Sequence, residues 1–141
     1  MHATVITTIE DAQARAARVR PAVGGFPYLA EVLRQAGVER YVFDVPSASV
    51  VYVTSAGDVL QPGGLIRSEK TVIPRFDEDA LIAAIRTDQE GRSTFPEFVE
   101  ASFQAGVTRY EVDTAQRTCS YSGVRGELYV EHYPAVEVSS V

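Results

Sequence analysis

An arginine, a tyrosine and an aspartate recur together in this chain at one fixed interval. The two triplets are Arg40, Tyr41 and Asp44, and, 69 residues later, Arg109, Tyr110 and Asp113. A guanidinium can anchor an anion, and a nearby carboxylate can act as a base or accept a hydrogen bond. Residues four apart on a strand share a face, so the arginine and aspartate of each triplet should reach one groove or surface stripe. The alternative is structural: the tyrosines pack in the core, the aspartates cap turns, and the arginines pair with them at the surface.

Tyrosines and acidic residues also alternate near the end of the sequence. One face of a predicted strand carries Glu127, Tyr129, Glu131 and Tyr133, and the other carries Leu128, Val130 and His132. This face could line a pocket with carboxylates and phenols, but the same alternation is typical of a half-solvated antiparallel strand. His132 could act as a general base near neutral pH or form part of the surface. Tyr121 follows Tyr52 at the same interval of 69 residues and is a further candidate for binding.

The few cysteines and histidines limit disulfide and metal chemistry. Cys119 is the only cysteine, so it can form neither an internal disulfide nor a cysteine-based zinc cluster. Its place in a predicted strand favours a buried, inert thiol. His2 and His132 are too few for a typical histidine-rich metal site. The sequence therefore predicts neither a metal nor a cofactor.

Composition is that of a globular protein of about one domain. The chain has 141 residues, of which 45% are hydrophobic and 23% charged. A net charge of −6 disfavours nucleic acids and anionic membranes as partners. No segment approaches the roughly 18 apolar residues of a membrane span, and Glu10 and Asp11 interrupt any apolar signal segment. We expect a cytoplasmic protein.

The triplets belong to a longer internal repeat. Residues 26–44 align without gaps with residues 95–113, and ten of the nineteen pairs are identical. Each copy predicts a helix that begins with Phe-Pro, because proline fits the first helical turn. Gly37 and Gly106 should end these helices, since a C-terminal cap often requires a left-handed backbone. A strand rich in aromatic and β-branched residues follows in each copy.

Further elements extend the repeat in both directions. A preceding helix is expected over about residues 9–20, capped by Thr7 with Glu10, and another over about 79–87, capped by Asp77. Thr94 and Glu97 form a capping-box pattern. Two more strands follow each central one, over 49–54 and 59–60 and over 118–122 and 127–133.

These elements predict the fold class α+β, with one domain over residues 1–141. Repeat 1 covers about residues 5–61, a linker about 62–71 and repeat 2 about 72–138. A half of this size would be marginally stable alone, so both αα-βββ units should share one largely antiparallel sheet, with helices on one face and a pseudo-twofold axis.

The second copy resembles a known family. The matching residues are Phe95–Phe98, Ala105–Asp113, Tyr121, Gly126–Glu127, Tyr129–Glu131 and Tyr133–Pro134. They are similar to the YbcV-like family of bacterial and phage proteins, a domain-of-unknown-function family sometimes labelled "phage envelope protein". The resemblance is best from about residue 95 to 138 and implies a small α+β protein with no established activity.

Two functions remain open from the sequence. The preferred one is a non-catalytic module that binds a small molecule or a protein partner, because the strands are rich in tyrosine and no catalytic motif occurs. The alternative is a small enzyme that uses Asp, Arg and Tyr of the repeated strands, with His132, in a cleft between the halves. A homodimer would form if the last strand left an open edge.

Overall fold

The computed structural model describes residues 2–139, with side chains from Thr4 onward. Its ten elements, in chain order, are α1 (His2–Val19), α2 (Phe26–Gln35), β1 (Val38–Asp44), β2 (Ser49–Thr54), β3 (Gly57–Gln61), α3 (Glu78–Gln89), α4 (Phe95–Gln104), β4 (Val107–Asp113), β5 (Thr118–Gly123) and β6 (Leu128–His132). The order ααβββ thus occurs twice. This confirms the α+β class, whereas the origin of the two halves by duplication stays a prediction.

All six strands form one antiparallel sheet in the order β3-β2-β1-β4-β5-β6. The halves meet at its centre, where β1 pairs with β4. In this pair Arg40 lies opposite Asp113, and Asp44 lies opposite Arg109. The positions shared by the two triplets are therefore brought together by the central pairing.

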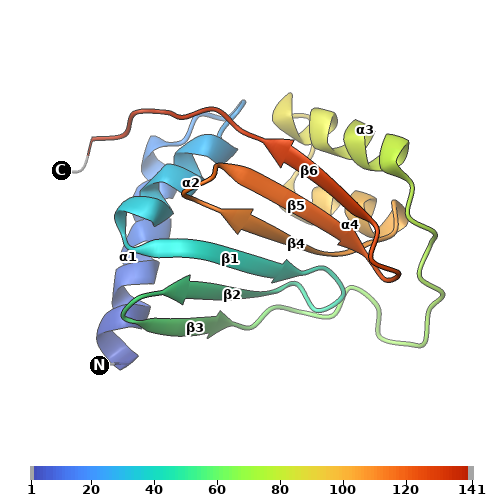
Figure 1. Ribbon diagram of the computed structural model, residues 1–141, viewed down its shortest axis with the longest axis horizontal. Coiled ribbons are helices and arrows are strands. Elements are labelled where there is room, and N and C mark those ends of the chain that lie inside the picture. The colour runs from blue at the N-terminus through green and yellow to red at the C-terminus, as the bar shows by residue number, and fades with distance from the viewer. Residues whose placement is uncertain (1, 140–141) are drawn as a thin grey trace.

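The four helices lie on one face of the sheet, with α1 and α2 near the first half and α3 and α4 near the second (Figure 1). Alternate strand residues follow this arrangement. On β1, Tyr41 and Phe43 are buried under the helices, whereas Arg40 and Asp44 on the other face are exposed. We call these the inner and the outer face of the sheet. Helices and strands of both halves contribute to one core.

Local signals place most helix ends correctly. The Asp77 side chain accepts a hydrogen bond from the backbone of Ala80 at the start of α3. Thr94 and Glu97 form the predicted capping box at the start of α4. Gly37 and Gly106, just beyond α2 and α4, have φ of 97° and 84°, the left-handed backbone expected of them.

The predicted start of α1 was wrong. The helix begins at His2, so Thr7 lies inside it rather than at its cap. The physical reason is the apolar stripe of Val5, Ile9 and Ala12, which continues one turn before the predicted start and is buried. At the other end of α1, Val19 is 39% exposed. Of the helices described, none is long and apolar enough to cross a membrane.

Candidate functional site

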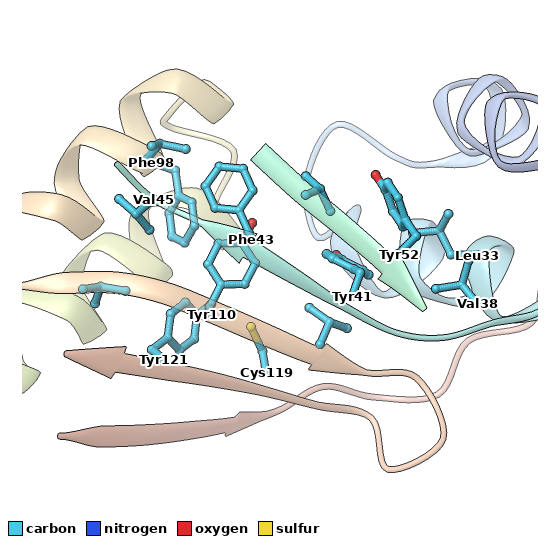
Figure 2. Close-up of a cluster of buried hydrophobic side chains, with 14 of the residues drawn as sticks. Leu33, Val38, Tyr41, Phe43, Val45, Tyr52, Phe98, Tyr110, Cys119 and Tyr121 are labelled. Atoms are coloured by element: carbon cyan, nitrogen blue, oxygen red, sulfur yellow. The ribbon is translucent and has the colours of Figure 1, made fainter. Parts of the chain in front are cut away.

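The candidate tyrosines of the central strands lie in the core. Tyr41, Tyr110 and Tyr121 are each 6% exposed on the inner face (Figure 2). The rings of Phe43 and Tyr110 stack with centroids 5.0 Å apart and planes at 21°. Burial raises the pKa of all three tyrosines well above the ordinary value. These phenols therefore stay neutral and act in packing.

The charged members of the triplets lie on the outer face of the sheet, whereas the tyrosines lie on the inner face. The Asp44 carboxylate accepts hydrogen bonds from the backbone N–H and the hydroxyl of Ser47. The Asp113 carboxylate accepts two from the backbone of Ala115 and Gln116, at 3.0 and 2.9 Å. Both aspartates thus cap the turns that follow their strands, as the structural alternative expected.

The arginines of the triplets do not share a carboxylate site with these aspartates. Arg40 contacts Glu111 across the central strands, with 3.4 Å between Nη1 and Oε1. Both side chains are more than a third exposed, so the pair adds little stability. Arg109 is exposed on β4. The charged members of the two triplets therefore form a solvated stripe on the outer face of the sheet.

The candidates on β6 divide between the two faces. Tyr129 is half-buried on the inner face, where its hydroxyl donates to Glu131, which also pairs with Arg86 of α3. Burial acts to raise the pKa of Glu131, but the hydrogen bonds from Arg86 and Tyr129 outweigh it and lower the pKa. His132 is exposed on the outer face opposite Thr118. The structure does not bring His132 together with Tyr129.

A cavity of about 670 Å³ opens at one end of the sheet. We call it the end cavity. Its walls come from α2, the start of β1, the β2–β3 and β4–β5 turns and the C-terminal segment, and its lining includes Glu31, Arg34, Glu39, Thr114, Arg117 and Val136. Its size is within the range of small-molecule sites. Residues of both halves line it, so it exists only in the assembled sheet.

Two sets of contacts hold the end cavity in shape. Along its lining, the buried Thr114 hydroxyl lies 2.8 and 2.9 Å from the backbone oxygens of Val38 and Glu39, which share its one O–H donor. At its rim, the C-terminal segment is fixed by a hydrogen bond from Gln35 Nε2 to the Val138 oxygen, at 2.9 Å. The Tyr133 backbone N–H also bonds to the Arg117 oxygen, at 3.0 Å. Packing and hydrogen bonds thus preorganise the walls before any ligand enters.

The charges of the end cavity are balanced but unevenly paired. Arg34 makes a bidentate contact to Glu31, at 2.9 and 2.8 Å. These hydrogen bonds, assisted by the more distant charge of Arg117, hold the pKa of Glu31 below its ordinary value. Within residues 2–139, neither the Arg117 guanidinium nor the Glu39 carboxylate has a hydrogen bond or ion pair of its own. Arg117 thus acts on Glu31 through its charge alone, and its guanidinium and the Glu39 carboxylate keep their capacity to form hydrogen bonds.

Sequence reasoning missed the end cavity. Its lining comes from loops, a helix end and the C-terminal segment, which carry no periodic pattern and whose meeting depends on the sheet. The sequence indicated Gly37 only as a helix end, and it singled out none of the other lining residues. In the structure, one lining residue has unusual backbone geometry. Arg117 adopts a φ of 55°, an uncommon value for a residue with a side chain. Ala48, in the matching turn of the first half, has a φ of 52°, so this geometry belongs to the turn.

The fold and the end cavity define an α+β protein whose six-stranded sheet is covered by helices on one face. Residues 13–132 match the family described as "Protein of unknown function (DUF1398)", and the chain belongs to that family. It is 46% identical over 134 residues to uncharacterized proteins of Mycobacterium tuberculosis and Mycobacterium bovis, covering 95% of this chain and 82% of theirs. The resemblance to a family of unknown function is confirmed at that level, while the YbcV-like name and the phage label stay predictions.

Proposed function

We propose that this protein is a non-catalytic binding module that holds a small zwitterionic molecule in the end cavity. The observation that carries the proposal is a pair of opposite charges without hydrogen-bond partners among the described residues, Arg117 and Glu39, on the lining of a cavity of about 670 Å³. A guanidinium recognises a carboxylate through paired hydrogen bonds, and a carboxylate recognises an ammonium. A molecule that bears both groups, as a free amino acid does, would satisfy both residues.

The position of the β4–β5 turn beside Glu39 supports this ligand class. The Thr114 backbone N–H and hydroxyl both bond to the Glu39 oxygen, at 3.1 and 2.9 Å, so the turn that carries Arg117 lies beside Glu39. Arg34 is already neutralised by Glu31, which leaves no surplus charge for a purely anionic ligand. A ligand with one group of each sign fits this balance better than a phosphate or a diamine.

The test is a thermal-shift screen of the purified chain. The probes are the free amino acids as zwitterions, with dicarboxylic acids, inorganic phosphate and diamines as comparison classes. A ligand at about 100 times its dissociation constant adds about 2.7 kcal/mol, which raises the melting temperature by roughly 5–10 °C. At least one zwitterion should give such a shift. If no zwitterion does, or if phosphate alone does, the proposed ligand class is wrong.

Variants then locate the bound molecule. Arg117→Gln and Glu39→Gln should each weaken binding about tenfold or more, because each removes one charged contact. Arg125→Gln is the matched control, since Arg125 is exposed in the turn at the opposite end of β5. Equal binding by all three variants would place the ligand outside the end cavity.

The same screen distinguishes the binding module from the small enzyme that the sequence left open as the alternative. A catalytic role in this cavity would require that a shifting ligand be consumed, which mass spectrometry of the incubated mixture measures. Unchanged ligand after prolonged incubation favours the binding module, whereas turnover that is lost in Glu39→Gln favours the enzyme.

A further inference from the structure

The outer face of the first half carries an apolar patch that no described helix covers (Figure 1). Val51 of β2 lies opposite Val42 on one side and Leu60 on the other, so the three form a continuous row across β1, β2 and β3. Val51 is 39% exposed and Leu60 65%. Val53, two residues after Val51 on β2, lies on the same face. We call these four residues the valine patch.

The fold itself does not require the valine patch. At the matching positions of the second half, 69 residues later, Val42, Val51 and Val53 are replaced by the polar residues Glu111, Ser120 and Ser122. The inner face differs from this, because Tyr41 and Tyr52 have the tyrosines Tyr110 and Tyr121 as their counterparts. The exposed apolar residues on the outer face of the second half, Leu128 and Val130, lie on the edge strand β6 alone, whereas the valine patch crosses three neighbouring strands. A contiguous exposed apolar surface of this kind is a mark of an interaction site.

Opposite charges flank the valine patch in a self-complementary way. Arg40 lies opposite Val53 on one side, and Asp58 lies opposite Val53 on the other. A twofold axis running along β2 between two facing sheets would exchange the places of β1 and β3. Asp58 of each copy would then lie over Arg40 of the other, Leu60 over Val42, and Val51 over its own equivalent. Such a contact is isologous, the usual form in homodimers.

We propose that a second copy of this chain covers the valine patch, so that two sheets pack outer face to outer face with β2 over β2. Aligned sheets pack about 10 Å apart with strands within about 30° of each other, so the row of Val42, Val51 and Leu60 would face the same row of the second copy. The arrangement of Arg40 and Asp58 on either side of Val53 indicates a second copy of this chain as the partner that covers this face. The end cavity is not part of this contact.

The first experiment measures the mass of the full chain in solution by light scattering after gel filtration, in about 150 mM salt to screen the charge of −6. We expect a particle of twice the 15.4 kDa chain mass. Val51→Lys should yield monomers, because it places like charges on the axis. Ser120→Lys, the matched control at the equivalent position of the second half, should remain dimeric. A monomeric wild-type chain at 100 μM overturns the proposal.

Two further variants test the flanking charges. Asp58→Lys should raise the dimer dissociation constant at least tenfold, because it faces Arg40 of the other copy. Glu10→Lys changes the net charge equally but lies on α1, which packs on the inner face, so it should leave the constant unchanged. Equal effects of both variants would mean that only net charge matters, and this would overturn the assigned arrangement.

Cross-linking locates the interface without depending on dissociation. A short bismaleimide should join two copies of Val51→Cys and not two copies of Ser120→Cys. The native Cys119 does not interfere, because it is 4% exposed. Cross-linking of the Ser120→Cys chains instead would show that the valine patch is not the interface. The same conclusion would follow if dimers form but neither variant cross-links, a result that pairing of open β6 edges would give.

Discussion

Thr114 and Val38 belong to different halves of the chain, yet the Thr114 hydroxyl lies 2.8 Å from the Val38 backbone oxygen. Thr114 is 3% exposed and Val38 is 1% exposed, so this hydrogen bond is shielded from water. The same hydroxyl reaches the Glu39 oxygen at 2.9 Å. One side chain thus ties the β4–β5 turn to the start of β1 and lines the end cavity.

Thr114→Val should lower the free energy of unfolding by about 1–2 kcal/mol. The substitution keeps the branched shape but removes the buried hydroxyl donor of the Val38 oxygen, while the Glu39 oxygen keeps its hydrogen bond from the Thr114 backbone N–H. Urea unfolding followed by circular dichroism measures the change. Thr118→Val is the matched control, since Thr118 is half-exposed on the outer face of β5, and its cost should be within about 0.5 kcal/mol of zero. Equal costs for both would contradict the role given to this hydrogen bond.

The ion pair between Arg67 and Glu100 predicts a dependence of stability on pH. Arg67 bonds both oxygens of Glu100, at 2.8 and 2.7 Å, and this contact, with a further hydrogen bond from Gln104, lowers the pKa of Glu100 to about 2. A lowered pKa means that the folded state binds the proton less tightly than the unfolded state. The stabilisation is therefore complete above about pH 4.5 and is lost as the pH falls toward 2.

The size of that effect is limited because the Glu100 side chain is 45% exposed. Between pH 5 and 2, we expect the free energy of unfolding of the wild-type chain to fall by at most about 1 kcal/mol more than that of Glu100→Gln. Unfolding titrations of both chains at each pH give this difference. Arg67→Gln serves as the second variant, since removal of the partner should abolish the same component. If Glu100→Gln retained the full pH dependence of the wild-type chain, another carboxylate would be responsible.

Cys119 should be unreactive in the folded protein. It is 4% exposed on β5, and burial raises the pKa of its thiol from 9.0 to about 12. Three pKa units reduce the reactive thiolate about 1000-fold near pH 8, before access is considered. Ellman's reagent should therefore modify the native chain only as fast as it unfolds, and the denatured chain at once.

An introduced thiol provides the control for that measurement. Val124 is 64% exposed in the β5–β6 turn, so Val124→Cys should react in the folded state at the rate of a free thiol. Rapid modification of the native wild-type chain would show that the strand opens far more often than its packing suggests.

Much of the fold could be predicted because its signals are local. The Thr94 capping box, the Asp77 cap and the glycines after α2 and α4 each depend on residues within one helical turn. The spacing of four residues between Arg40 and Asp44 correctly placed both side chains on one face of β1. The start of α1 was misplaced because a capping pattern at Thr7 competed with an apolar stripe that continues to Val5.

The candidate site was harder to predict because its residues meet only through long-range contacts. Thr114 reaches Val38 across 76 positions, and Gln35 reaches Val138 across 103. No periodicity in the sequence encodes the path of the C-terminal segment that completes the cavity. The repeated triplets attracted attention instead, since both halves place them at the equivalent turns, where Asp44 and Asp113 have a structural task.

Gly37 and Gly106 offer a matched pair that separates backbone strain from steric conflict. Both end a helix with a positive φ, of 97° and 84°. A Cβ added at Gly37 meets nothing within 4 Å, whereas one at Gly106 would lie 2.5 Å from the Phe76 nitrogen and 2.6 Å from the Arg75 carbonyl carbon. The segment before α3 thus passes directly over the end of α4.

Gly37→Ala should cost about 1–2 kcal/mol, the price of a left-handed backbone in a residue with a side chain. Gly106→Ala should cost at least about 2 kcal/mol more, because the segment at Arg75 and Phe76 must also move and the hydrogen bond of 2.8 Å from the Asp77 N–H to the Ala105 oxygen is strained. Urea unfolding of the two variants beside the wild-type chain measures both costs. Equal costs would mean that the segment yields without resistance, and that only the conformation of the helix ends decides how well these positions tolerate a side chain.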